Sequence, residues 1–153
     1  MRNLEQVLAH AENYCENNGS RLTIKRKQVL TGLLISDKAL SAYELIDFCK
    51  GEFGETLQPM SMYRILDFLN NQDLVHKLNL ANKYVACEHI NCNHEHLVSQ
   101  FLICVECQSV KEINISKTVM TELQRNVLQV GFHLVRPQLE MNCICDACIT
   151  SQA

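Results

Sequence analysis

Apolar residues in the first half of the chain recur with the period of an amphipathic helix, and they predict four helices. Local signals mark the ends of three of them. Asn17-Asn18-Gly19 closes the first helix, Thr23 caps the second, and Pro59 suits the first turn of the fourth. In chain order, the apolar faces consist of Leu4, Val7, Leu8, Ala11 and Cys15; Val29, Leu30, Leu33 and Leu34; Leu45, Ile46 and Phe48; and Met62, Ile65, Leu66 and Leu69.

The third helix has the most specific start signal. Ser41 and Glu44 stand three positions apart, which is the spacing of a capping box. Gly51 and Gly54 are expected to break this helix, because glycine in a helix interior is unfavourable.

After the fourth helix the pattern changes from helical to alternating. Residues 74–78 and 83–87 are short β-type runs on either side of Asn79 to Asn82, and together they predict a hairpin. Short helices followed by a hairpin are typical of a winged helix-turn-helix, whose recognition helix reads DNA. The alternative at this step is that the fourth helix belongs only to the core.

The second half predicts a smaller α/β unit. Residues 101–103, 110–115, 133–135 and 139–141 have the composition of strands, and a helix is expected from Ser116 to about Val130, stopped by Gly131. A unit of roughly 50 residues buries little core, so bound zinc and dimerisation would both help it fold.

These patterns predict an α+β chain with two domains. An N-terminal winged helix-turn-helix domain is expected over residues 1–87, with a hinge at about 86–96. A C-terminal α/β dimerisation and metal-binding domain is expected over residues 97–153.

Composition is that of a soluble globular protein, with 47% hydrophobic and 20% charged residues in a chain of 153. No apolar run approaches the roughly 18 residues of a membrane span, and the N-terminus reads as a helix start rather than a signal peptide. The chain is therefore expected in the cytoplasm, where its nine cysteines would stay reduced.

The two halves differ in charge and in cysteine content. Residues 1–86 carry ten basic and ten acidic residues, whereas residues 87–153 carry four and seven, which gives the net charge of −3. Seven of the nine cysteines lie in the second half. A net charge of −3 argues mildly against a nucleic-acid binder, but the run Lys25-Arg26-Lys27 supplies a local basic surface.

Two Cys-x-x-Cys pairs carry the clearest chemistry. Cys104 and Cys107 form the first pair, and Cys145 and Cys148 form the second. Four thiolates complete a tetrahedral shell around Zn²⁺ and leave no position for water or substrate. This pattern therefore favours a structural zinc site that stabilises the second domain. The alternatives are two redox dithiols or a pair of disulfides.

A second group of candidate ligands lies between the two halves. Cys87, His89, Cys92, His94 and His96 fall within ten residues. His76 stands one strand earlier, and Glu112 stands five residues after Cys107. A tetrahedral site that takes His76, Cys87, one histidine of the cluster and Glu112 would span the hinge. This donor set suits Zn²⁺ better than Fe²⁺ or Mn²⁺. The alternative is a loop that binds metal adventitiously.

The segment from Pro59 to Leu69, PMSMYRILDFL, resembles the recognition-helix signature of the ferric uptake regulator family. Arg21-Leu22-Thr23 through Arg26, the histidine-rich cluster and both Cys-x-x-Cys pairs match that family in the same order. The resemblance covers about residues 4 to 149. The runs at 75–77, 84–87 and 110–112 are most similar to its zinc-uptake-regulator branch.

The resemblance implies a homodimeric, metal-dependent transcriptional repressor without catalytic residues, and its zinc branch implies control of zinc uptake genes. It implies two zinc ions per subunit, no small-molecule substrate and no membrane association. Cys104, Cys107, Cys145 and Cys148 would hold the structural ion. His76, Cys87, Glu112 and either His94 or His96 would hold the regulatory ion, with His96 slightly favoured.

The resemblance also assigns the DNA contacts. Tyr63 and Arg64 would meet the bases of a double-stranded operator. Ser61, Lys25 and Lys27 are expected at phosphates, which set register but read no sequence.

Three positions depart from the family pattern. Ile24 stands where proline is usual, so the second helix lacks a preset start. The interval from Leu97 to Ile103 is lengthened, which leaves the choice between His94 and His96 open. Pro137 occupies a place where iron-sensing members often have a metal-binding histidine, which favours the zinc branch.

Other functions predict different signatures. A zinc deaminase needs His-x-Glu ahead of Pro-Cys-x-x-Cys, and a metalloprotease needs His-Glu-x-x-His; the chain has neither. A zinc-dependent hydrolase is therefore disfavoured. A thiol-based redox sensor, and an iron- or manganese-responsive repressor of the same family, remain as alternatives.

Overall fold

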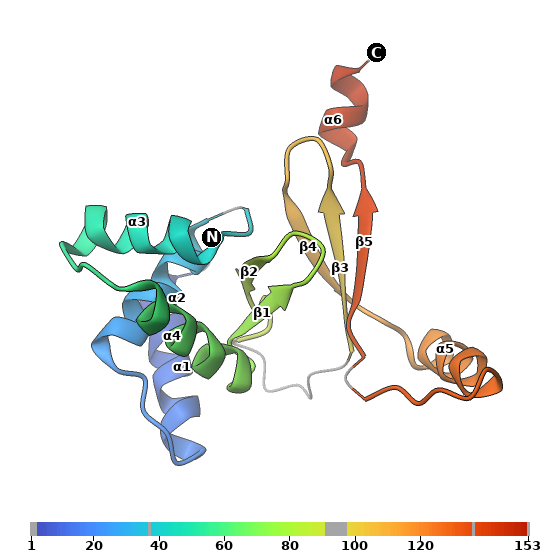
Figure 1. Cartoon of the computed structure of the whole chain (residues 1–153), viewed down its shortest axis with the longest axis horizontal. Helices are drawn as coiled ribbons and strands as arrows, with labels where there is room; N and C mark the ends of the chain where they lie inside the picture. The colour runs from blue at the N-terminus through green and yellow to red at the C-terminus, as the bar shows by residue number, and fades with distance from the viewer. Residues whose placement is uncertain (1–2, 37, 91–97, 136, 153) are drawn as a thin grey trace. The chain divides into compact units, whose positions relative to one another are not determined.

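The computed structural model describes residues 3–36, 38–90, 98–135 and 137–152, and it divides the chain into two compact units, Met1–Asn93 and His94–Ala153. Helices and strands are both present, as predicted for an α+β chain (Figure 1). In the described residues no helix is long and apolar enough to cross a membrane.

The first unit consists of four helices followed by a hairpin (Figure 1). The helices are α1 (Leu4–Asn17), α2 (Ile24–Ile35), α3 (Ala42–Phe53) and α4 (Pro59–Asn71), and the strands are β1 (Val75–Leu78) and β2 (Lys83–Ala86). The predicted helices and hairpin are thus all observed. In addition, an isolated antiparallel bridge joins Leu40 to Tyr84 of β2; the sequence did not predict this bridge.

Side-chain caps start the helices where the sequence predicts them. Thr23 accepts a hydrogen bond from the backbone N–H of Arg26, so α2 begins at Ile24 without the proline that is usual there. Ser41 and Glu44 form the complete capping box of α3. Gly51 does not break α3; the helix runs through it to Phe53 and ends at Gly54, whose φ of 67° closes the helix in the left-handed region.

The core of the first unit lies where the apolar faces of the helices meet the hairpin. Leu30, Leu45 and Leu66 are completely buried, one from each of the last three helices. Full burial of such a side chain contributes about 1.5–3 kcal/mol to folding. Gly32 marks the closest approach of α2 and α3, because a Cβ there would lie 2.8 Å from the Phe48 ring.

The second unit is a three-stranded sheet with two helices (Figure 1). Its elements are β3 (Ser99–Cys104), β4 (Val110–Asn114), α5 (Lys117–Gln129), β5 (Leu139–Cys143) and α6 (Asp146–Ser151). β3 is central, with β4 antiparallel on one side and β5 parallel on the other.

Two features of this unit differ from the sequence prediction. Residues 133–135, predicted as a strand, form none: the β3–β5 register begins only at Leu139, and His133, Leu134 and Val135 are exposed. The six-residue helix α6 was not predicted. No residue of α5 is buried, although the helix is amphipathic and is capped by Ser116, where it was predicted to begin.

Candidate metal centres and recognition helix

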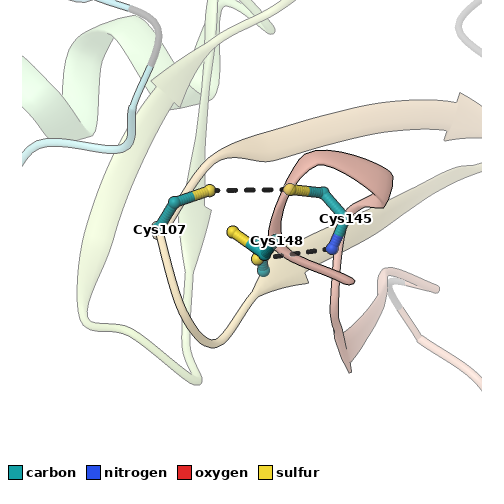
Figure 2. Close-up of side chains that lie close together, drawn as sticks. Cys107, Cys145 and Cys148 are labelled. Atoms are coloured by element: carbon teal, nitrogen blue, oxygen red, sulfur yellow. Dashed lines mark hydrogen bonds between the residues drawn. The ribbon is translucent and has the colours of Figure 1, made fainter. Parts of the chain in front are cut away.

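The two Cys-x-x-Cys pairs converge at one end of the sheet in the second unit. Cys104 ends β3, Cys107 lies in the turn before β4, Cys145 caps α6 and Cys148 lies within that helix. The ligand atoms of all four residues lie within 4.8 Å of one another. Figure 2 shows Cys107, Cys145 and Cys148 turned toward a common point, with 3.8 Å between the Sγ atoms of Cys107 and Cys145.

Backbone pairing brings these distant cysteines together. Cys104 and Cys143 are partners in the parallel β3–β5 register, and the N–H of Val105 donates to the carbonyl of Cys143 at 2.9 Å. The first pair sits in a tight turn closed by Gln108, whose φ is 61°. The β3–β5 pairing therefore places the first pair beside the segment that leads into the second pair.

The surroundings of Cys104 and Cys107 favour the thiolate form, whereas those of Cys148 favour the thiol. Backbone N–H groups of Cys107 and Cys145 lower the pKa of Cys104 to about 6, and the backbone nitrogen of Cys145 lies 3.4 Å from the Cys104 sulfur. The hydroxyl of Ser109, 3.1 Å away, lowers the pKa of Cys107. The neighbouring sulfur of Cys145 raises the pKa of Cys148 to about 12.

These shifts test whether the four residues suit a metal ion. Each thiolate that forms beside the others makes the next harder to form, which is why the shifts run in opposite directions. A divalent cation removes that repulsion, and four sulfur donors in a half-buried shell are the donor set of a structural zinc site. The cluster could hold a structural zinc.

Two candidate ligands of the second site lie on the hairpin. His76 is on β1, and Cys87 directly follows β2 and donates its N–H to the carbonyl of Leu74 at 2.9 Å. Their ligand atoms lie within 4.8 Å of each other. Cys87 is fully buried, and the N–H of His89 donates to its sulfur at 3.4 Å. The hairpin thus presents a sulfur and an imidazole nitrogen together.

The third candidate ligand, Glu112, lies on β4 opposite Phe101 of β3. It is only 5% exposed and accepts a hydrogen bond of 2.7 Å from the hydroxyl of Ser99. A carboxylate buried to this degree needs charged or hydrogen-bonding partners. The remaining candidate ligands, His94 and His96, lie outside the described residues, as does Cys92.

The recognition helix α4 separates a buried face from an exposed one. Met62, Ile65, Leu66 and Leu69 are buried against the core. Ser61, Tyr63 and Arg64 are exposed on the other side, with Tyr63 40% exposed. All three predicted contacts on this helix are therefore available to a partner.

The basic run at the start of α2 is divided among different environments. Lys25 is exposed. Lys27 forms an ion pair of 2.9 Å with Glu12 of α1. The Arg26 guanidinium stacks 3.6 Å above the Phe68 ring of α4 and donates to the carbonyl of Arg21 at 2.7 Å. Arg26 thus joins α2 to α4, and Lys25 remains the residue of this run that is open to solvent.

Comparison with known proteins decides the family. The profile described as "Ferric uptake regulator family" matches residues 17–142, which is most of the chain. The chain belongs to the ferric uptake regulator family. The sequence is also 35% identical over 149 residues to the zinc uptake regulation protein of Escherichia coli (strain K12), covering 97% of this chain and 85% of that protein. The zinc uptake regulation protein of Shigella flexneri is similar to the same degree.

Solved structures agree with this family assignment. A zinc uptake regulator complexed with zinc and DNA has a TM-score of 0.88 and 32% identity, with 99% of each chain covered. The crystal structure of holo XcZur has a TM-score of 0.80 and 33% identity, covering 96% of this chain and 99% of that one. The ferric uptake regulator of Helicobacter pylori, at 21% identity and a TM-score of 0.58, shares the fold.

Several features of the sites were not predicted from the sequence. The hydrogen bond from Ser99 to Glu112 follows from the β3–β4 register, which no local pattern specifies. The stacking of Arg26 on Phe68 likewise depends on how α2 packs against α4. The pairing of Lys27 with Glu12 could have been suspected only once α1 and α2 were known to be neighbours.

Proposed function

We propose that this protein is a zinc-responsive transcriptional repressor that binds double-stranded operator DNA as a homodimer and controls zinc uptake genes. The observation that carries this proposal is the match over 99% of both chains to a zinc uptake regulator complexed with zinc and DNA. Family members are transcription regulators, and the proposal assigns no catalytic activity and no small-molecule substrate to this chain.

The proposed division of labour follows the two expected domains. Residues 1–87 would bind DNA, residues 86–96 would act as the hinge, and residues 97–153 would dimerise and bind metal. The protein would act in the cytoplasm. The helices and hairpin of the first unit, and the sheet and cysteine cluster of the second, support this assignment.

The first of two proposed zinc ions per subunit is structural. Cys104, Cys107, Cys145 and Cys148 would hold it in a closed shell. It would tie the β3–β4 turn to the start of α6, joining segments about 40 residues apart in sequence. Its role would be to stabilise the second unit, which has few buried residues of its own.

The second proposed zinc ion is regulatory. His76, Cys87 and Glu112 would hold it together with His96 or His94, so that its ligands come from both units. The proximity of the His76 and Cys87 donor atoms and the burial of Glu112 support this set. When bound, zinc would favour one relative pose of the two units. Moving the protein from about 1% to 99% in that pose requires a preference of about 5.5 kcal/mol, and structural zinc sites reach on the order of 10 kcal/mol.

Operator reading is assigned to the exposed face of α4. The Arg64 guanidinium can donate two hydrogen bonds to guanine O6 and N7, and the Tyr63 ring can pack on a thymine methyl. Ser61 and Lys25 would contact phosphates. Lys27 would do so only after leaving Glu12, so its contribution is expected to be smaller than that of Lys25.

Zinc-buffered operator binding tests the proposal. The operator would first be selected from a random duplex library with zinc-loaded protein, and binding would then be titrated against free Zn²⁺, Fe²⁺ and Mn²⁺. We expect binding to respond to zinc at the lowest free concentration. Cys87→Ala should remain folded by circular dichroism and lose the zinc response, because the regulatory set loses its only thiolate.

The matched control is Cys49→Ala. Cys49 is also fully buried in the first unit but belongs to no proposed donor set. It should keep the zinc response. If Cys87→Ala binds operator with the same zinc dependence as the wild type, the regulatory site is wrongly assigned; if no duplex is selected in any metal, the proposed function fails.

A further inference from the structure

The exposed face of α4 carries a side chain to which no role has been given. Met60, the second residue of the helix, is 67% exposed. Met62, two positions later on the same helix, is completely buried. The contrast means that the helix does not simply bury its methionines, and it raises the question of what Met60 contacts when α4 meets its partner.

Helix geometry puts Met60 at the centre of the exposed face. With about 100° of rotation per residue, Tyr63 lies ~60° to one side of Met60 and Arg64 ~40° to the other. Met62 and Leu69, in the middle of the buried face, lie ~160–180° away. An approach that lets Tyr63 and Arg64 both reach base edges therefore brings Met60 toward the bases between them.

Position along the helix leads to the same conclusion. In helix-turn-helix proteins the N-terminal residues of the recognition helix contact base edges. Met60 follows Pro59, which occupies the first turn, and precedes Tyr63 and Arg64 by one turn. It lies on the part of the helix that enters the groove.

The chemistry of the side chain selects its partner. Methionine offers no hydrogen-bond donor and only a weak acceptor, so it cannot read the polar groups of guanine, cytosine or adenine. The C5-methyl of thymine is the apolar group displayed in the major groove. The flexible thioether chain of methionine adapts to irregular apolar surfaces of this size.

We infer that Met60 is a specificity-determining residue that contacts the C5-methyl of a thymine in each operator half-site. This inference rests on the proposed DNA-binding function and goes beyond it, since it names a third base-reading position on α4. It predicts that the operator contains a thymine whose methyl group, rather than its hydrogen-bonding pattern, is recognised.

Replacing single thymines by deoxyuridine tests this directly, because only the methyl group is lost. Zinc-loaded full-length protein would be titrated with the selected operator and with duplexes carrying one dT→dU change per half-site. For the wild type we expect one position where the change weakens binding by about fourfold per half-site, the factor that corresponds to one buried methyl group. For Met60→Ala, dT and dU at that position should bind equally well.

Two further variants keep the result interpretable. Ile35→Ala removes another exposed apolar side chain, 55% exposed at the end of α2, and should leave the dT/dU ratio unchanged. Tyr63→Ala should remove methyl sensitivity at a different thymine. The inference is overturned if Met60→Ala keeps the dT/dU ratio of the wild type at every position, or if the wild type shows no methyl effect that Met60→Ala removes. Selection of no operator by the wild type would instead overturn the proposed function, and this inference with it.

Discussion

Individual side chains of the first unit divide between holding the fold and facing outward. Arg26 and Arg64 illustrate the division, because both are basic and both lie near or on α4. Arg26 stacks on Phe68 and binds the carbonyl of Arg21, so its charge serves packing between α2 and α4. Arg64 is exposed on the opposite side of α4 from the core and has its guanidinium available for recognition.

Arg64→Ala should cost about 1–3 kcal/mol of operator affinity and relax the base preference at one position per half-site. The reason is that a bidentate contact with guanine is lost while the fold is untouched. Competition between the selected operator and variants at each base pair would measure both effects.

Arg64→Lys is the informative control, because lysine keeps the charge but cannot form the planar two-donor contact. It should lose discrimination while it retains salt-dependent, non-specific binding. Equal loss of affinity for every sequence would instead show that Arg64 binds a phosphate.

Local signals account for most of the element boundaries in this protein. Thr23 and Ser41 cap their helices as predicted, because a cap involves residues only three positions apart, and Ser116 caps the helix that it was predicted to begin. Gly51 was wrongly expected to break α3, since one glycine costs a helix interior only about 1 kcal/mol relative to alanine, and the helix ends at the other predicted glycine, Gly54. The strand predicted at residues 133–135 failed because strand formation depends on a partner, and β3 pairs with residues 139–143 instead.

The candidate sites show the same distinction. The spacing of the cysteine pairs predicted the cluster in the second unit, which the fold brings within 4.8 Å. The hairpin places His76 beside Cys87 because β1 pairs with β2, and Cys87 directly follows β2. The choice between His94 and His96, by contrast, stays open, with His96 slightly favoured, because the interval from Leu97 to Ile103 is lengthened relative to the family pattern.

The capping box of α3 provides a test at the scale of one element. The Glu44 side chain accepts the N–H of Ser41 at 3.2 Å and pairs with Lys83 of β2, also at 3.2 Å. Burial alone would raise the pKa of Glu44, but the hydrogen bonds with Ser41 and the Lys83 ammonium outweigh it and lower the pKa. A carboxylate with a lowered folded pKa contributes stability above its unfolded pKa of about 4.3. That contribution to stability is lost as the pH falls through the pKa that Glu44 has in the folded protein.

Glu44→Gln should therefore destabilise the first unit by less than about 1 kcal/mol at pH 7, because the pair with Lys83 is partly exposed. The difference from the wild type should shrink as the pH falls through the lowered pKa of Glu44, because the wild-type carboxyl is then protonated. Ser41→Ala should cost about 0.5–2 kcal/mol throughout this titration, since it removes an uncharged cap. Urea unfolding at matched pH measures these differences, and any acid-induced loss of zinc is common to wild type and variants. A Glu44→Gln effect that did not shrink as the pH was lowered would contradict the electrostatic origin of this stability.

At the scale of the whole molecule, the second unit exposes many large apolar side chains. Eleven large apolar residues among its described positions are exposed: Val105, Ile113, Val119, Leu128, Val130, Phe132, Leu134, Val135, Met141, Ile144 and Ile149. Met120, Leu123 and Val127 of α5 also line an open apolar hollow of about 160 Å³ with Leu134, Pro137 and Leu139. Apolar surface of this extent marks an interaction site, and the proposed homodimer would cover it.

Val119 tests this interface with little risk to the fold. It is 50% exposed on the same face of α5 as Leu123, and its side chain is not buried within the chain. Val119→Glu should place a charge in the subunit contact and shift the protein toward monomer, because an unpaired charge is costly to desolvate. Operator affinity should fall with it, since one subunit can occupy only one half-site. Thr121→Glu, on the opposite face of α5, adds the same charge and should remain dimeric. Sedimentation velocity over a range of protein concentrations separates the outcomes: a Val119→Glu protein that sediments as the wild type does would place the subunit contact away from this face of α5.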